Sequence, residues 1–177
     1  ATARPGMLDP CQPDWTVTPK TVELQVPDVD SVVRMVGTTS LGAGLNPARL
    51  DDARVVVTAG FGIGGAENLG PVRQLAEAVD GALAGSLRVT TNRWVPAQLQ
   101  VGFTGRAVAP RFYIAVAVSG QPNHMFGARK AEHIIAINND PEAPIFKSAD
   151  FGVVGDWSEI VPALTRELLA ARGRAGD

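Results

Sequence analysis

The sequence has few of the features that many functional classes require. Its only cysteine, Cys11, cannot form an internal disulfide, and its proline-rich surroundings give no metal-ligand spacing. A formal net charge of −2 gives no electrostatic basis for binding nucleic acid or an anionic membrane surface. No apolar run approaches the roughly 18 residues of a membrane span, and no signal-peptide pattern opens the chain. A cytoplasmic globular protein is therefore expected.

Common catalytic signatures are also missing. There is no Gly-x-Ser-x-Gly motif around Ser119, which makes a hydrolase serine a poor interpretation. The glycine-rich stretch 60–65 matches neither the dinucleotide fingerprint nor a P-loop, and no lysine follows it. It is compatible with a phosphate-binding loop or with a plain turn between strand and helix. The carboxylates lack a companion base or metal motif, so a conventional enzyme is poorly supported.

What the sequence does contain is the pattern of one α/β domain. The chain of 177 residues is 45% hydrophobic and 19% charged, as in ordinary globular proteins. Apolar runs predict buried strands at 54–60, 86–91, 112–120, 133–138 and 152–156. Helical spacing is found at 67–83, after Gly120 and at 157–172. This alternation predicts a doubly wound parallel sheet.

The two ends of the chain are expected to differ from this domain. Residues 1–20 are rich in proline and predict an extended arm, followed by a strand at 21–26, a short helix at 28–37 and a loop at 41–52. The interpretation divides the chain into an arm with a short strand and helix (1–50), a ligand-binding domain (51–170) and a frayed tail (171–177). The absence of an initiator methionine suggests a processed or trimmed chain.

Polar residues and glycines gather where four of the predicted strands end, at 58–68, 118–124, 137–144 and 153–157. In an open parallel sheet the ligand crevice lies beyond these carboxyl ends. Each residue also has a structural interpretation. Asn138 and its neighbours precede Pro141, where turn chemistry favours them, and Asp156 with Glu159 forms a capping box. His124 could donate a hydrogen bond to a ligand carbonyl or simply pack.

Three longer blocks carry a resemblance to a known family. "VGFTGRAVAPRFYIAVAVSG", "HIIAINNDPEAPIF" and "ADFGVVGDWSEIVPAL" resemble the C-terminal domain of the electron-transfer flavoprotein alpha subunit, and "VVVTAGFGIGGAENL" and "TARPGM" are similar to further family segments. The resemblance implies a DHS-like, Rossmann-like NAD/FAD-binding fold that holds an extended FAD. It also implies a heterodimer with a beta-type subunit and an electron carrier, not an enzyme, between a dehydrogenase donor and a quinone-linked acceptor.

The resemblance assigns a role to each part of the predicted site. Thr104 would lie near flavin N5, His124 would reach the C2 carbonyl, and residues 119–124 would wrap the pyrophosphate and ribityl chain. Asn138 would hold the adenosine portion. It implies no catalytic residue and no metal ligand. The implied cofactor-binding residues are Phe61, Ser86, Leu87, Val101, Gly102, Phe103, Thr104, Ser119, Gly120, Gln121, Pro122, Asn123, His124, Asn138, Asp156 and Trp157.

Six positions depart from the family pattern. Phe61 and Leu87 stand where the family has arginines, and Phe103 stands where it has glutamine. Gln121, Pro122 and Asn123 replace the Ala-Ile-Gln that precedes the histidine in the family. An arginine charge about 4 Å from the flavin ring favours the anionic reduced flavin by roughly 4 kcal/mol at an effective dielectric of about 20. Its loss would therefore change the redox properties of the flavin. An alternative therefore stays open, in which the chain is a non-redox FAD- or AMP-binding assembly module. Family alpha subunits also carry a domain before TARPGM, so the chain is expected to be either a fragment or a short paralogue.

Overall fold

The protein folds around one five-stranded parallel sheet. The computed structural model describes residues 12, 16–18, 20–23 and 48–174. The strands are β1 (Val55–Ala59), β2 (Ala82–Gly85), β3 (Phe112–Val116), β4 (His133–Asn138) and β5 (Phe151–Val154), and their order in the sheet is β2-β1-β3-β4-β5. Every neighbouring pair is parallel, which confirms the predicted doubly wound sheet.

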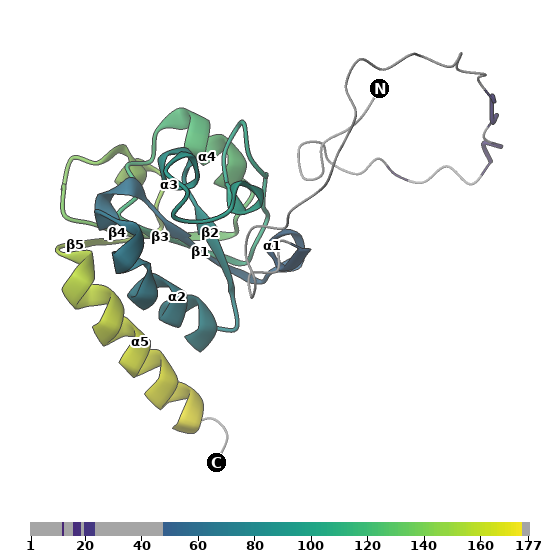
Figure 1. Ribbon diagram of the computed structural model, residues 1–177. Helices are drawn as coiled ribbons and strands as arrows, with labels where there is room; N and C mark the ends of the chain where they lie inside the picture. Colours follow the sequence, from purple (N-terminus) through teal and green to yellow (C-terminus); the bar gives the residue numbers. More distant parts are fainter. Residues whose placement is uncertain (1–11, 13–15, 19, 24–47, 175–177) are drawn as a thin grey trace, which may run out of the picture.

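Helices cover both faces of this sheet (Figure 1). Helices α2 (Leu69–Ala78) and α5 (Trp157–Arg174) pack against each other on one face, and α3 (Leu87–Thr91) and α4 (Pro122–Ala128) lie over the other. The short α1 (Ala48–Asp52) lies next to β2. Single 3₁₀ turns stand at Phe61–Ile63, Ala66–Asn68, Ala97–Leu99 and Pro144–Lys147.

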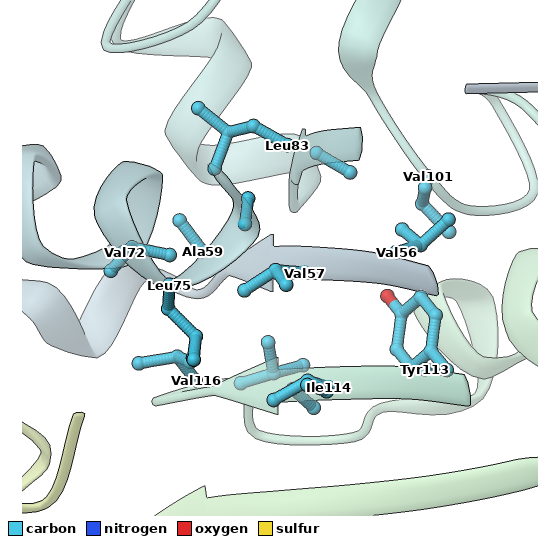
Figure 2. Packing of buried hydrophobic residues seen from close by; sticks show 14 of the residues in the cluster. Val56, Val57, Ala59, Val72, Leu75, Leu83, Val101, Tyr113, Ile114 and Val116 are labelled. Atoms are coloured by element: carbon cyan, nitrogen blue, oxygen red, sulfur yellow. The ribbon is translucent and has the colours of Figure 1, made fainter. Parts of the chain in front are cut away.

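Side chains of the two central strands alternate between these two helical layers. Val57 pairs with Ile114 across β1 and β3, and both lie on the side of Leu75 from α2 (Figure 2). Val56 pairs with Tyr113, and both point to the opposite side, toward Val101 (Figure 2). Because helices cover both faces, the central strands are apolar throughout, as expected for a parallel sheet.

The strand predicted at 86–91 is wrong, because this segment is helix α3 and the strand precedes it. Strand β2 reads Ala-Leu-Ala-Gly and has no β-branched residue, and the sequence pattern placed its first two residues at the end of the helix 67–83. That helix stops at Ala78, and Asp80 takes a left-handed conformation with φ 49°. Val89 and Thr90 favoured a strand by their branching. The helix forms because both are buried and the Thr90 hydroxyl donates to the Leu87 carbonyl at 2.9 Å.

Three further expectations need correction. The run at 152–156 was expected to be buried, but β5 is an edge strand and all four of its residues are exposed. The predicted loop at 41–52 contains helix α1, and α5 continues to Arg174, into the predicted tail. Residues 21–23 are not in a strand. The rest of that strand, the helix at 28–37 and residues 41–47 lie outside the described residues, and the domain division stays a prediction.

None of the helices in residues 48–174 or the few described residues before them is both long enough and apolar enough to cross a bilayer.

The residues that directly follow β1 and β3, Gly60 and Ala117, approach each other at very short range. A Cβ at Gly60 would lie 1.9 Å from the carbonyl oxygen of Ala117, so only glycine fits there. The Gly60 N–H donates to Val116 at 2.8 Å, and the Ala117 N–H donates to Ile137 at 2.8 Å. These bonds hold Ala117 at φ 53°, a left-handed conformation that is strained for a residue with a Cβ.

This strain predicts that Ala117→Gly stabilises the fold. Relief of a left-handed alanine, less the added entropy of the unfolded chain, should raise the free energy of unfolding by about 0.5–1 kcal/mol, measured by urea denaturation. Ala115→Gly is the matched control, because Ala115 lies in the regular part of β3 and is buried. It should lower the free energy of unfolding. An equal decrease in the free energy of unfolding in both variants would show that position 117 carries no strain.

Candidate functional site

A cavity of about 600 Å³ opens at the carboxyl edge of the sheet, where β1 and β3 lie side by side. The strand order changes direction at this pair, so the chain leaves β1 toward α2 on one face and leaves β3 toward α4 on the other. Such a divergence leaves a crevice in doubly wound folds. We call this space the switch-point cavity. It is lined by residues 61–62, 86–88, 100–104, 117–119, 121, 123–124, 138–140 and 143–144.

Most of the predicted site residues meet in this cavity. Twelve of the sixteen line it: Phe61, Ser86, Leu87, Val101, Gly102, Phe103, Thr104, Ser119, Gln121, Asn123, His124 and Asn138. They come from five segments that are distant in the sequence: Phe61 after β1, residues 86–87 after β2, residues 101–104 after the 3₁₀ turn Ala97–Leu99, residues 119–124 after β3, and Asn138 at the end of β4. The structure brings these side chains together, and their contact with a cofactor stays a prediction.

Four predicted residues lie outside the lining. Gly120 stands behind it with φ 79°, and a Cβ there would lie 2.3 Å from the Ile145 backbone. Pro122 is at the start of α4. Asp156 caps α5 by accepting the Ser158 N–H at 2.8 Å, and this bond lowers the pKa of its carboxyl. Trp157 packs against the core instead of the cavity. Gly120 and Asp156 therefore have structural roles whatever else they contact.

The turn at 100–106 is fixed from two sides. The Val101 N–H donates to Gly85 at the end of β2 at 3.0 Å, and the Phe103 N–H donates to Asn123 before α4 at 2.7 Å. Arg106 donates to the Gln100 carbonyl at 2.7 Å, which closes the turn. Residues 101–104 are therefore held as a rigid wall between α3 and α4.

The polar loop after β4 forms the opposite wall. The buried Asn138 donates from Nδ2 to the Val118 carbonyl at 2.9 Å and accepts the Asp140 N–H on Oδ1 at 3.0 Å. Asp140 in turn accepts the Glu142 N–H at 2.9 Å. The amide of Asn138 therefore ties the loops after β3 and β4 together. The exposed Asn139 and Asp140 are the side chains that this loop presents to the cavity.

Aromatic rings form the mouth of the cavity. Phe61 stacks on Trp94 with ring centroids 5.2 Å apart, and the Arg88 guanidinium lies 3.7 Å from the Phe61 centroid on a cation–π contact. Phe103 makes an edge contact with Phe126 at 5.1 Å. Phe61 and Phe103 are still 37% and 54% exposed, so the cavity has open apolar walls and is not filled by these rings.

His124 is held neutral by its surroundings. Its Nε2 lies 2.8 Å from the hydroxyl of Tyr113, a residue so completely buried that its own pKa is raised. Burial lowers the pKa of His124 to about 4, although the Val101 backbone opposes this shift. The other ring nitrogen, Nδ1, is buried, and no described residue makes a hydrogen bond of good geometry with it. A neutral imidazole can donate from one nitrogen only, so a ligand would meet a weak, uncharged partner here.

The predicted set of cofactor-binding residues left out four polar or charged residues of the lining. Arg88 and Gln100 were given no binding role and Asn139 only a turn role, whereas Asp140 was placed by the family resemblance on the adenosine side. Arg88 adjoins the predicted Leu87, and Gln100 directly precedes the predicted Val101. Each lies next to a residue of the family motifs, and this proximity was the only feature of the sequence that pointed to a place in the site.

A second hollow lies at the amino edge of the sheet. It has a volume of about 660 Å³, and Arg54, Arg111 and Arg172 are among its lining residues. Arg172 approaches the Ala78 carbonyl at the end of α2 at 3.5 Å, and none of the predicted site residues reaches this hollow. Within the described ranges, no cluster of three metal-ligating side chains occurs at either place.

Comparison with known proteins agrees with this geometry. Residues 49–129 match the family model for the electron transfer flavoprotein FAD-binding domain. Protein FixB of Escherichia coli strain K12 is 42% identical over 166 residues, which cover 92% of this chain and 52% of FixB, and FixB of strain SE11 gives the same values. The chain therefore spans about half the length of the curated relatives it matches. A putative sugar-phosphate isomerase from Listeria monocytogenes is 10% identical over 71% of each chain, with a TM-score of 0.38 that supports no argument.

The buried imidazole predicts a dependence of stability on pH. Below its ordinary pKa of 6.5, His124 takes up a proton in the unfolded chain but not in the folded one, until the pH reaches about 4. Between these values the fold should lose about 3 kcal/mol of stability through this residue. His124→Gln should remove this contribution, so that its free energy of unfolding falls less between pH 6.5 and pH 4 than that of the wild type. Urea denaturation from pH 7 to pH 4 measures the difference. His133→Gln is the control, because His133 is exposed. Parallel pH profiles for wild type and His124→Gln would contradict the assignment.

Proposed function

Because the chain belongs to the electron-transfer flavoprotein alpha family, we propose that it binds FAD in the switch-point cavity and carries electrons between a dehydrogenase and an acceptor. One observation carries the proposal beyond family membership. Three large apolar side chains that are exposed, Phe61, Leu87 and Phe103, all line the same cavity. Exposed apolar groups gathered in one concave site indicate a binding site for a ligand with a large apolar surface. The flat ring system of a flavin has such a surface.

The polar groups of the cavity fit the rest of FAD. Thr104 offers a hydroxyl beside the apolar walls, as a flavin ring with carbonyl and ring-nitrogen acceptors requires, and His124 lines the same cavity. Ser119, Gln121 and Asn123 stand where α4 begins and would face the phosphates. Asp140 presents a carboxylate that can accept hydrogen bonds from ribose hydroxyls. The flavin supplies the electron-transfer chemistry, and these residues bind and orient it.

Arg88 compensates in part for the two arginines that the sequence lacks at positions 61 and 87. It is the only lysine or arginine among the cavity-lining residues that the structure describes. Its stacking on Phe61 holds the guanidinium at the mouth of the cavity. We infer that Arg88 supplies positive charge near the flavin and so favours the negative charge that reduction adds.

The alternative function was a nucleotide-holding module without redox activity. Its main support was that Phe61, Leu87 and Phe103 could fill a flavin site that has lost its polar partners. Phe61 instead stacks on Trp94, Phe103 makes an edge contact with Phe126, and the cavity that these residues line stays open, which favours the redox function.

Partners follow from family membership alone. We propose that a beta-type subunit completes the carrier and that a dehydrogenase donates the electrons to it. A quinone-linked acceptor and a cytoplasmic location, both suggested by the sequence analysis, stay predictions.

The proposal predicts that the purified protein binds FAD and shows flavin absorbance bands that disappear on reduction and return on oxidation. Heat denaturation should then release FAD, identified by chromatography. Phe103→Ala should weaken FAD binding about tenfold, because it removes an apolar wall. Phe151→Ala is the matched control, since Phe151 is 63% exposed on β5 outside the cavity and should have no effect. A colourless protein that releases AMP or nothing would refute the electron-transfer function.

The role of Arg88 is tested by the midpoint potential of the bound flavin. Removing the charge in Arg88→Gln should lower the one-electron midpoint potential of the flavin. The expected decrease is roughly 40 mV if the exposed guanidinium lies about 4 Å from the flavin and is screened almost as in water. Arg88→Lys should retain most of the wild-type potential. Arg93→Gln is the control, because Arg93 is also exposed and lies outside the cavity lining. Equal potentials for wild type and Arg88→Gln would show that Arg88 has no electrostatic role.

A further inference from the structure

A chain of polar side chains runs from the protein interior to the switch-point cavity. Thr90 on α3 and Gln100 are 7% and 8% exposed, whereas Thr104 is exposed and lines the cavity. The Thr90 hydroxyl lies 3.0 Å from Gln100 Oε1, and Gln100 Nε2 lies 2.8 Å from Thr104 Oγ1. Two buried polar groups thus stand behind one exposed hydroxyl.

One set of donors and acceptors accounts for both links of this chain. Thr90 donates its proton toward Gln100 Oε1 and shares it with the Leu87 carbonyl at 2.9 Å. With Oε1 occupied as an acceptor, the amide presents Nε2, which can only donate, to Thr104. The Thr104 oxygen is therefore an acceptor toward the interior. In the described part of the chain, no group accepts the Thr104 proton.

The segment that carries Gln100 is also rigid. The Gln100 carbonyl accepts the Arg106 N–H at 2.7 Å, and a Cβ at Gly105 would lie 2.4 Å from the same oxygen. The Gln100 N–H donates to Ala97 at 3.1 Å. The backbone at Gln100 is therefore held in place, and its buried side-chain amide has little room to turn away from Thr104.

We propose that Gln100, anchored by Thr90, is a positioning residue that keeps the Thr104 hydroxyl as a hydrogen-bond donor directed at the bound ligand. The inference rests on the proposed function in one respect, that the acceptor is an atom of the flavin ring. A threonine hydroxyl can donate or accept, and the chain removes this ambiguity before the ligand arrives. Preorganised donors of this kind bind an acceptor without a reorientation cost.

The arrangement predicts that Gln100 acts only through Thr104. Gln100→Met keeps the length and shape of the side chain but removes both polar atoms, so it should weaken FAD binding roughly five- to tenfold. Thr104→Val should weaken it by a similar factor. In the Thr104→Val background, Gln100→Met should cause no further loss, because the group that it orients is already gone. Gln98→Met is the control on the same segment, since Gln98 is exposed and outside the cavity.

A spectroscopic readout separates positioning from a merely structural role. The Raman bands of the flavin ring respond to hydrogen bonds at its nitrogen and carbonyl atoms. Gln100→Met and Thr104→Val should shift the same bands in the same direction, and Gln98→Met should shift none. Gln100→Glu should also shift them, because a carboxylate accepts the Thr104 proton and turns the hydroxyl away from the cavity.

The outcomes distinguish this inference from the proposed function. If Gln100→Met weakens FAD binding equally with Thr104 present or replaced by valine, the positioning role is overturned. NMR of the protein without FAD gives an independent test, because the Gln100 side-chain amide signals should move in both Thr90→Val and Thr104→Val but not in Thr91→Val. Unmoved signals would overturn the hydrogen-bonded chain whatever the protein binds. Failure of the wild type to bind FAD would instead overturn the proposed function and the flavin as acceptor.

Discussion

The close approach of the chain segments that leave β1 and β3 is the constraint on which the site depends. Gly60 lies against the Ala117 carbonyl at a distance that no other residue allows, and backbone hydrogen bonds fix Ala117 in a left-handed conformation. From this point the chain leaves toward α2 on one face of the sheet and toward α4 on the other. The cavity is the space between these diverging segments, so its position follows from the order of the strands.

Polar side chains around the cavity have two separate tasks. The buried amides of Asn138 and Gln100 are bonded within the protein and hold neighbouring loops or side chains in place. The exposed Thr104 and Asp140 face the cavity. A buried amide left without partners would be costly, so its hydrogen bonds stabilise the shape of the site before any ligand binds. The stretch "NNDPEAPIFKSADFGVVGD" illustrates this division, because its first asparagine braces the wall and its first aspartate lines it.

The sequence was sufficient for those parts of the fold in which local pattern and burial agree. The β-branched run of β1 and the apolar run of β3 predicted central strands because both are covered on two faces. Strand β2 escaped prediction because it is only four residues long and has no β-branched residue. Its Gly85 is required by packing, since a Cβ there would lie 2.6 Å from Val95. The exposure of β5 depends on its place at the sheet edge, which no local pattern encodes. In the site, strand ends and family motifs identified twelve lining residues, whereas Arg88 and Gln100 lie outside the motif positions and needed the tertiary structure.

The central claim is that the cavity between β1 and β3 holds the flavin of FAD. A crystal structure of the protein after saturation with FAD tests it most directly. The account predicts electron density for the isoalloxazine ring between Phe61, Leu87 and Phe103, with the Thr104 hydroxyl within hydrogen-bond distance of the ring. Density for FAD in the hollow at the amino edge of the sheet, or a switch-point cavity that remains empty while FAD is bound elsewhere, would contradict it.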